Sequence, residues 1–165
     1  MTACELLAAV SPALAQRILE EVHASDKELY RVALSGVAQA KKVRPVFLER
    51  QPRAERHRAM LTSLVRPEFN MIAANLISGW LVKNQPALLV DFLGALNIPN
   101  EKGVVENLPE KVDDDALKNA VDLLLGKHPP EIVGLYLHAF NDMNEANWPN
   151  LQKVLNEDVR LMLGE

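Results

Sequence analysis

Residues 66–98 read RPEFNMIAANLISGWLVKNQPALLVDFLGALNI, and we expect the other helices to pack around this segment. Residues 69–82 are apolar except for three side chains: Asn70, Asn75 and Ser78. A helix on a protein surface shows a polar face, so we expect this one to be surrounded by other helices. Pro86 divides the stretch into two helices, because proline ends one helix and suits the first turn of the next. The sequence therefore predicts a buried central hairpin.

The rest of the chain carries start signals and apolar spacings typical of helices. Thr2 with Glu5, and Ser25 with Glu28, have the spacing of a capping box, and a cap residue precedes Pro12. Apolar residues recur at helical spacing in the remaining segments: 11–23, 25–41, 52–66, 113–128, 130–143 and the residues after 149. A single helical turn is expected at 45–50. We predict one all-α domain over residues 1–165, with about eight helices packed antiparallel.

Residues 97–112, NIPNEKGVVENLPEKV, form the longest stretch without helix signals. This acidic loop separates two helical halves. Loops longer than about 12 residues in compact domains are often functional or mobile. Two interpretations of this loop are open: it contributes to binding, or it only connects the two halves.

The two halves share a weak internal repeat. A shift of 63 positions aligns Pro67 with Pro130, and it also aligns further boundary residues: Glu68 with Glu131, Asn84 with Asn147, Pro86 with Pro149 and Leu88 with Leu151. One interpretation is duplication of a helical unit, which would give a short array that resembles the HEAT and armadillo class. The signature residues of those repeats are absent. The alternative is two independent hairpins with the same boundary residues.

Composition excludes several classes of protein. The chain of 165 residues has one cysteine, Cys4, which rules out an internal disulfide and a multi-cysteine metal site. The first residues lack the positive region of a secretory signal. No apolar run reaches the roughly 18 residues that a membrane span needs. We expect a cytoplasmic protein that does not enter a membrane.

Positive charge is concentrated in residues 41–66. This segment holds eight basic residues and two acidic ones, a formal charge of +6, whereas the remainder carries −10 of the overall −4. The candidate binding residues in it are Arg50, Arg53, Arg56 and Arg58. Arg53 and Arg56 share a helix face at a spacing of three, and Arg50 joins them if the helix extends that far. Arginine binds carboxylate and phosphate through two-point contacts, so the segment predicts an anionic partner.

Two alternatives compete with an acidic protein partner. In the first, acidic residues of the same fold neutralise the arginines, with residues 101–115 as candidates. In the second, the arginines bind a nucleic-acid backbone. The pI near 5.6 argues against nucleic acid. So does the expectation that no aromatic side chains interleave with the arginines for base stacking.

Catalytic and metal-binding interpretations rest on few residues. His57 lies on the apolar side of its helix, where a hydrogen-bonded packing role is the simpler interpretation. His138 and Asp142 are four residues apart, with Glu131 and Glu145 nearby, and could bind a metal or transfer protons. Asp113, Asp114 and Asp115 are explained by helix capping. We predict no catalytic residue, no cofactor and no metal site.

The sequence thus favours a protein-interaction or scaffold domain over an enzyme. Its contact surface would include the arginine-bearing helix at 52–66, and the loop at 97–112 is a further candidate. The apolar end at 161–163 leaves self-association open. Four methionines are expected to fill the core: Met60, Met71, Met143 and Met162.

Overall fold

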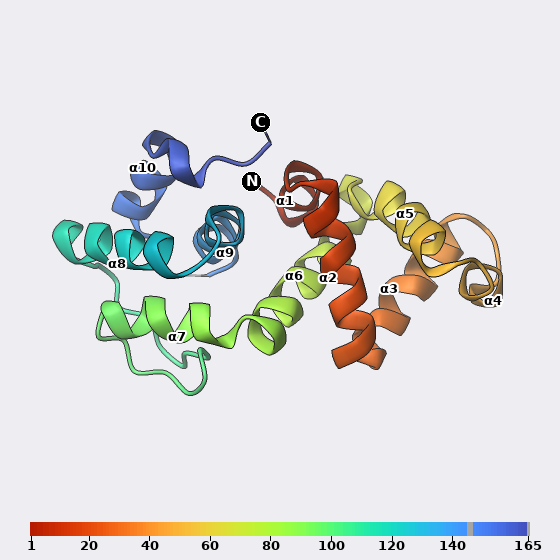
Figure 1. Ribbon diagram of the computed structural model, residues 1–165, viewed down its shortest axis with the longest axis horizontal. Coiled ribbons are helices and arrows are strands. Elements are labelled where there is room, and N and C mark those ends of the chain that lie inside the picture. The colour runs from red at the N-terminus through yellow and green to blue at the C-terminus, as the bar shows by residue number, and fades with distance from the viewer. Residues whose placement is uncertain (145–146, 165) are drawn as a thin grey trace. The chain divides into compact units, whose positions relative to one another are not determined.

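The computed structural model describes residues 1–144 and 147–164 and is all-α over these residues (Figure 1). Its α-helices are α1 (Ala3–Ala9), α2 (Pro12–Ser25), α3 (Lys27–Ala40), α4 (Pro45–Glu49), α5 (Arg53–Leu64), α6 (Asn70–Asn84), α7 (Pro86–Ala95), α8 (Asp114–Lys127), α9 (Pro130–Met143) and α10 (Pro149–Glu157). Two short 3-10 helices are η1 (Pro67–Phe69) and η2 (Val159–Leu161). The predicted all-α class is confirmed. The described residues form ten α-helices rather than eight, because the short α1 and α4 are separate elements.

The caps explain why the helices begin where they do. Thr2 and Glu5 form the predicted capping box at the start of α1. The prediction that Ser25 starts the next helix is wrong, because Ser25 ends α2 and the Asp26 carboxylate accepts a hydrogen bond from the Leu29 N–H at the start of α3. A carboxylate at this position also interacts with the positive end of the helix dipole.

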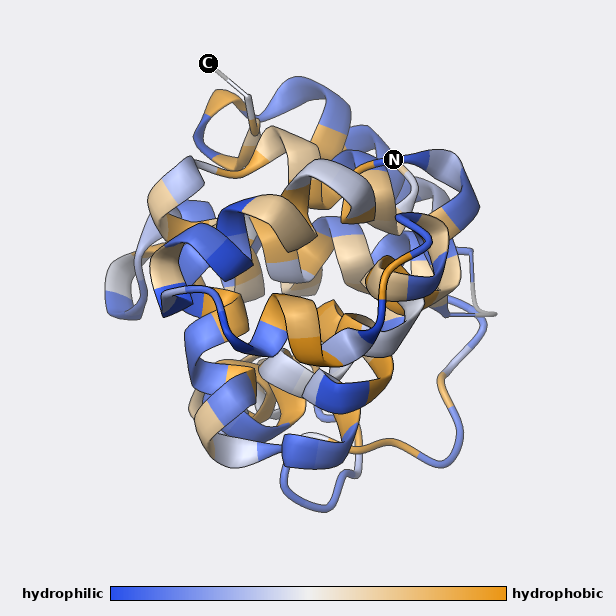
Figure 2. Ribbon diagram, turned by 90° about the vertical axis from the view of Figure 1, so that its right-hand side faces the viewer, coloured by the Kyte–Doolittle hydropathy of each residue, from blue (hydrophilic) through white to orange (hydrophobic). Residues whose placement is uncertain are grey.

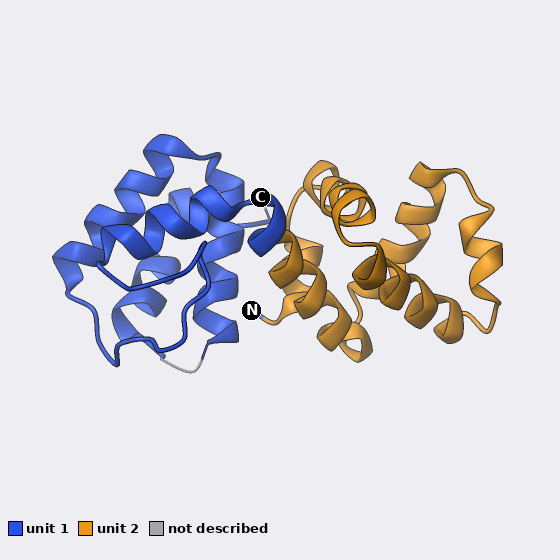
Figure 3. Cartoon of the chain, turned by 90° about the horizontal axis from the view of Figure 1, so that it is seen from below, with its two compact units in different colours: residues 1, 81–165 blue, residues 2–80 orange. Residues whose placement is uncertain are grey.

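The chain divides into two compact units, which Figure 3 colours separately. Unit 2 comprises residues 2–80, and unit 1 comprises Met1 with residues 81–165. Their sequences differ in charge: unit 2 has eleven basic and eight acidic residues, a formal +3, and unit 1 has seven basic and fourteen acidic residues, a formal −7. The prediction that the chain is one domain stays a prediction.

Unit 2 is built on three helices, α2, α3 and α5, that pack against one another. Their buried side chains are mostly aliphatic: Ile18, Leu19, Val22, Leu34, Val37, Met60 and Leu64. Helix α6 adds Trp80, whose indole N–H donates to a Glu21 carboxylate oxygen at 2.6 Å. The centre of unit 2 is therefore mainly aliphatic, and the buried Trp80 indole is satisfied by a hydrogen bond.

Unit 1 has an aromatic centre. The rings of Phe92 and Phe140 lie 5.3 Å apart, and Phe140 lies 5.2 Å from the ring of Trp148. The Trp148 indole N–H donates to the carbonyl of Pro109 at 2.8 Å, which fixes the loop between α7 and α8 to the start of α10. The loop at 97–112 is thus helix-free, as predicted, and anchored at its later end.

Helix α6 is less enclosed than its composition predicts. Its buried residues include Ala73, Leu76, Ile77, Trp80 and Leu81, but Met71 is 78% exposed and Val82 is 40% exposed. Met71, Asn75, Ser78 and Val82 recur at helical spacing and are all exposed, so one side of α6 faces solvent. The expectation that this helix is buried all round is wrong.

Among the described residues, no helix is both long and apolar enough to cross a membrane.

The prediction that four methionines fill the core holds for only one of them. Met60 is fully buried, whereas Met71, Met143 and Met162 are exposed. The residue type alone does not show whether an apolar side chain lies on the buried or on the exposed side of its helix. The apolar end at residues 161–163 is only partly exposed, because Leu161 is buried and Met162 is 43% exposed.

The internal repeat stays a prediction. Pro86 and Pro149 both occupy the first turn of a helix, as the alignment implies. However, Pro67 begins the 3-10 helix η1, whereas Pro130 begins α9 directly. The two halves therefore share helix boundaries without sharing every element.

Candidate interaction surface

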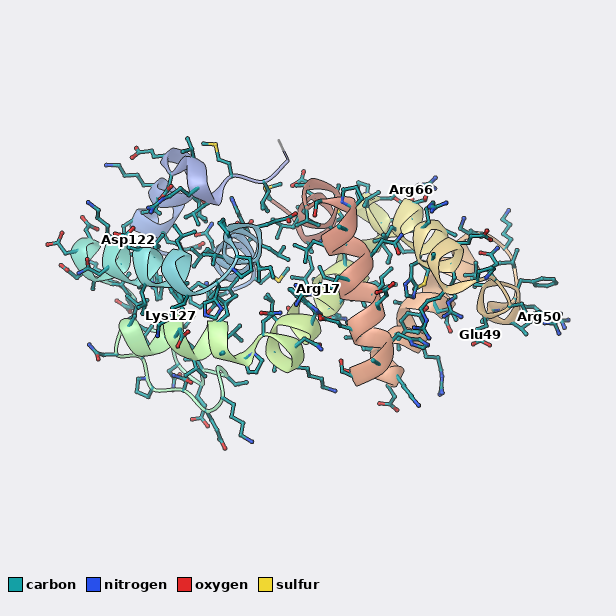
Figure 4. All side chains as sticks on the ribbon, viewed as in Figure 1. Arg17, Glu49, Arg50, Arg66, Asp122 and Lys127 are labelled. Atoms are coloured by element: carbon teal, nitrogen blue, oxygen red, sulfur yellow. The ribbon has the colours of Figure 1, made fainter. Side chains whose placement is uncertain are left out.

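The predicted binding arginines lie on α5 or directly after α4, both in unit 2. Arg50 follows the last residue of α4, and Arg53 is the first residue of α5. Figure 4 labels Arg50 beside Glu49 at the end of α4. Gln51 and Pro52 separate the two helices, so α5 does not extend back to Arg50, and the shared face proposed for Arg50 is not formed.

Arg58 projects from a different side of α5 than Arg53 does. The two are five residues apart, which corresponds to about 140° around an α-helix. Arg58 thus lies opposite the buried side of α5 that carries His57, Met60 and Leu64. Arg50, Arg53 and Arg58 are all exposed.

These three arginines, which we call the arginine surface, have no ion pair within residues 2–80, all of which the structure describes. Arg17 of the same unit behaves differently, because its guanidinium contacts the Glu21 carboxylate at 3.0 Å. Neutralisation of the arginine surface by acidic residues of its own unit is therefore not observed. Neutralisation by residues 101–115 of unit 1 stays untested.

Arg56 has a structural role that the other three lack. Its Nη1 donates to the Glu49 carbonyl oxygen at 3.1 Å, and its Cζ lies 5.7 Å from the centre of the Tyr30 ring. The last carbonyl groups of a helix lack partners within that helix, so this guanidinium caps α4 and joins it to α5. Arg56 is half-buried. Its direct contact with a partner stays a prediction.

A buried polar cluster holds α5 in place behind the arginine surface. His57 is fully buried, as its inward position predicts, and its Nε2 is hydrogen-bonded to the Tyr30 hydroxyl at 2.8 Å. The His23 ring packs edge-on against Tyr30, with the ring centres 4.6 Å apart. The Nδ1 of His57 is buried and has no hydrogen-bond partner within unit 2. The cluster therefore ties α2, α3 and α5 together.

Burial and neighbouring basic groups act together on the pKa of His57. Burial lowers its pKa to about 4, and the nearby charges of Arg56, His23 and Arg53 act in the same direction. Burial also lowers the pKa of His23, with Arg53, Arg56 and Lys27 adding to the effect. Both imidazoles are consequently neutral near pH 7. Two neutral imidazoles thus lie beside Arg53 and Arg56 near the start of α5, whose first turn also contains Glu55.

An exposed apolar patch accompanies the arginines and was missed in the sequence. Phe47 is 56% exposed, and Val43 and Val46 are each 38% exposed. We call these three residues the apolar tip. Only Leu48 of α4 is buried, so this single turn directs its other apolar side chains outward. In Figure 2, the turn of α4, which lies at the right-hand end of Figure 1, faces the viewer as a hydrophobic ribbon between hydrophilic segments.

The apolar tip corrects one expectation. Phe47 lies between Arg44 and Arg50 in the chain, so an aromatic side chain does interleave with the basic residues. Pro45 is the sequence signal that could have revealed the exposure of Phe47. It starts a five-residue helix, and such a short helix buries only one of its apolar residues, Leu48.

The loop between α7 and α8 forms a groove in unit 1. The groove has a volume of about 910 Å³, and its lining includes Val82, Pro86, Pro99, Val104, Glu101 and Lys102. The Asn100 side chain accepts a hydrogen bond from the Gly103 N–H at 3.0 Å, and Glu101 and Val104 exchange backbone hydrogen bonds. The loop is thus shaped by its own contacts. Its lining mixes both signs of charge, so charge does not define a ligand for it.

In the part of the chain that the structure describes, His138 and Asp142, the candidate histidine and carboxylate pair, each have another partner. His138 is half-buried, and its Nε2 lies 3.3 Å from the Leu161 carbonyl oxygen. Asp142 instead pairs with the amino terminus of Met1 at 2.8 Å. Glu145 lies outside the described residues. Among the described residues, no group of three or more histidine, cysteine, aspartate or glutamate side chains could hold a metal ion.

The aspartates at 113–115 occupy the helix start expected for them. The Asp113 carboxylate accepts a hydrogen bond from the Ala116 N–H at 3.2 Å and caps α8. Asp114 and Asp115 follow in the first turn. Capping therefore accounts for this run.

Comparisons with protein-family models, with curated proteins and with solved structures find no match to this chain.

Proposed function

We propose that this chain is a helical protein-interaction domain that binds an acidic partner protein through the arginine surface. The observation that carries the proposal is the exposure of Arg50, Arg53 and Arg58 without an ion pair in their own unit. Long charged side chains on a protein surface are often paired or scattered, whereas these lie in a segment with a formal charge of +6. A protein surface rich in carboxylates is the partner that this charge complements.

The chemistry of arginine suits this role. A guanidinium group binds a carboxylate through two parallel N–H···O hydrogen bonds and remains charged at any physiological pH. Exposed charges at an interface mainly increase the rate of association and its dependence on salt. The binding proposed here should therefore weaken as ionic strength rises.

The fold supports the surface with a rigid base. Arg56 joins the end of α4 to α5, and the Tyr30–His57 hydrogen bond fixes α5 to α3. A surface held by buried contacts loses less conformational freedom on binding than a flexible one does. The expected cytoplasmic location belongs to the same proposal.

Nucleic acid is the second candidate partner, and the exposed Phe47 is the observation that supports it. An aromatic ring beside arginines can stack on a base of a single strand. The formal charge of −10 outside residues 41–66 argues against it, because an extended polyanion would also meet those residues. Acidic protein therefore remains the favoured partner.

The test compares three immobilised polyanions at low salt: poly-glutamate, heparin and single-stranded DNA. We expect retention on poly-glutamate that falls steeply as salt is raised. The triple variant Arg50→Glu, Arg53→Glu and Arg58→Glu should lose this retention, because it replaces three attractive charges by repulsive ones. Unchanged circular dichroism would show that the helices persist.

Arg31→Glu is a single-site control of the same kind of charge reversal, because Arg31 is an exposed arginine of the same unit outside residues 41–66. It changes the net charge without changing the arginine surface, and we expect retention close to that of the original chain. Equal losses in the control and in the triple variant would show a general charge effect and contradict the proposal. Stronger retention on DNA than on poly-glutamate would favour the second candidate.

A further inference from the structure

The apolar tip lies within the basic segment, next to two members of the arginine surface. Arg44 precedes α4, and Arg50 follows it, so Phe47 and Val46 are bracketed by guanidinium groups along the chain. Arg53 begins the next helix three residues later. Salt bridges alone would not require an exposed aromatic ring at this place.

Leaving the apolar tip in water has a cost in free energy. Apolar area that remains exposed forgoes the favourable transfer out of water, in proportion to the area. Leu48 of the same turn shows that the fold can bury an apolar side chain from α4. An apolar group flanked by polar and charged residues is the usual composition of a binding site, with an apolar centre and a charged rim.

We propose that the segment bound by this domain is acidic and amphipathic: its carboxylates pair with Arg50 and Arg53, and its apolar side chains pack on Phe47 and Val46. This inference rests on the proposed function and specifies the chemistry of the partner. Aromatic and arginine side chains together are the residues that most often dominate interface energies.

Two other anionic partners fit the surface less well. Single-stranded nucleic acid could stack on Phe47, but the valines of the apolar tip offer no stacking platform. An anionic membrane is an extended surface and would also approach the many carboxylates outside residues 41–66. A short acidic and amphipathic segment contacts only residues 41–58, so it avoids this repulsion.

The experiment measures binding of labelled probes by fluorescence anisotropy at low salt. The first probe is a peptide in which leucine and phenylalanine recur between glutamates, and the second is poly-glutamate of the same length. Single-stranded DNA and vesicles containing phosphatidylserine complete the set. We expect the amphipathic peptide to bind about tenfold more tightly than poly-glutamate, equivalent to about 1.4 kcal/mol.

Two variants separate the apolar contribution from the charged one. Phe47→Ala should remove the tenfold advantage of the amphipathic peptide and leave poly-glutamate binding unchanged. The double variant Arg50→Glu and Arg53→Glu should weaken both acidic probes. Val32→Ala is the control, because Val32 is 58% exposed on α3, outside the segment, and its loss should change neither affinity.

The other possible results would refute the amphipathic partner, the proposed function or both. Equal binding of both acidic probes, with no effect of Phe47→Ala, would refute the amphipathic partner and leave the proposed function standing. Binding of neither acidic probe would refute both. Tighter binding of DNA or of vesicles than of the amphipathic peptide, lost in Phe47→Ala, would show that the apolar tip serves another class of ligand.

Discussion

The hydroxyl of Tyr30 lies 2.8 Å from Nε2 of His57 and joins α3 to α5 inside unit 2. His57 is fully buried, and Tyr30 is 6% exposed. Since Arg53 and Arg58 project from the same α5, this hydrogen bond helps to fix the helix that carries them. Arg53 lies one turn before His57 on this helix, and Arg58 projects from another side of it.

Loss of the Tyr30 hydroxyl should destabilise the protein. Tyr30→Phe keeps the ring but leaves His57 without its hydrogen-bond partner, and an unsatisfied buried polar group costs about 1–3 kcal/mol. We expect a decrease of that size in the free energy of unfolding, measured by urea denaturation.

A double-mutant cycle with His57→Phe supplies the control. With both polar groups replaced, neither is left unsatisfied, so the double variant should be less destabilised than the sum of the single variants predicts. Strictly additive losses would mean that the two side chains do not interact in solution.

Stability should fall as acid is added, because of His57. Its pKa is 6.5 in the unfolded chain and about 4 in the folded protein, where it is buried beside Arg56 and other positive groups. Between these values the unfolded chain binds more protons, so the free energy of unfolding is greatest above pH 6.5 and decreases towards pH 4. The decrease from this residue amounts to up to about 3 kcal/mol.

Urea denaturation at several pH values across this window measures the slope. His57→Phe should reduce it markedly. A smaller slope should remain, since burial also lowers the pKa of His23 and of His138 in the folded protein. An identical slope in the original chain and the variant would contradict a buried neutral His57.

Gly103→Ala should disturb the loop between α7 and α8. Gly103 has a φ of +90°, and an added Cβ would lie 2.5 Å from the Cβ of Leu89. The substitution is therefore strained both by its backbone angle and by contact with an atom that cannot move freely. We expect a lower melting temperature and faster amide hydrogen exchange in residues 99–107.

Gly126→Ala is the matched control for that substitution. Nothing lies within 4 Å of a Cβ added at Gly126, which is in α8. Alanine favours helix over glycine by up to about 1 kcal/mol, so this variant should be as stable as the original chain or more so. If the two variants behaved alike, Gly103 would not hold the loop as described.

Asp113 should contribute measurably to α8. Asp113→Ala removes the side chain that caps the Ala116 N–H and should cost about 1 kcal/mol of unfolding free energy. Asp115→Ala provides the comparison, because Asp115 is exposed in the first turn and interacts mainly with the helix dipole, worth about 0.3–1 kcal/mol. A larger loss from Asp115→Ala would assign the cap to the wrong aspartate.

Local signals in the sequence predicted much of the fold. The capping box at Thr2 and the prolines that begin α7 and α10 act within one or two turns, so they can be recognised without tertiary structure. The inward position of His57 followed from helical spacing. Its partner Tyr30, 27 residues earlier, did not, because packing of α3 against α5 decides which inward residues meet.

The errors occurred where tertiary packing chooses between equivalent residues. Ser25 and Asp26 are both good caps, and the sequence does not say which one begins α3. Met71 has the same apolar character as its buried neighbours, yet it lies on the exposed side of α6. The basic segment was evident from its charge, but the exposure of Phe47 depends on the single residue, Leu48, that α4 buries.

The most direct measurement of the central claim is an amide NMR titration of the isotope-labelled chain with the amphipathic acidic peptide. We predict that shift changes concentrate in residues 41–58 and disappear in the double variant Arg50→Glu and Arg53→Glu. Shift changes confined to residues outside this segment, or changes that persist in the double variant, would contradict the claim that the arginine surface and the apolar tip form the binding site.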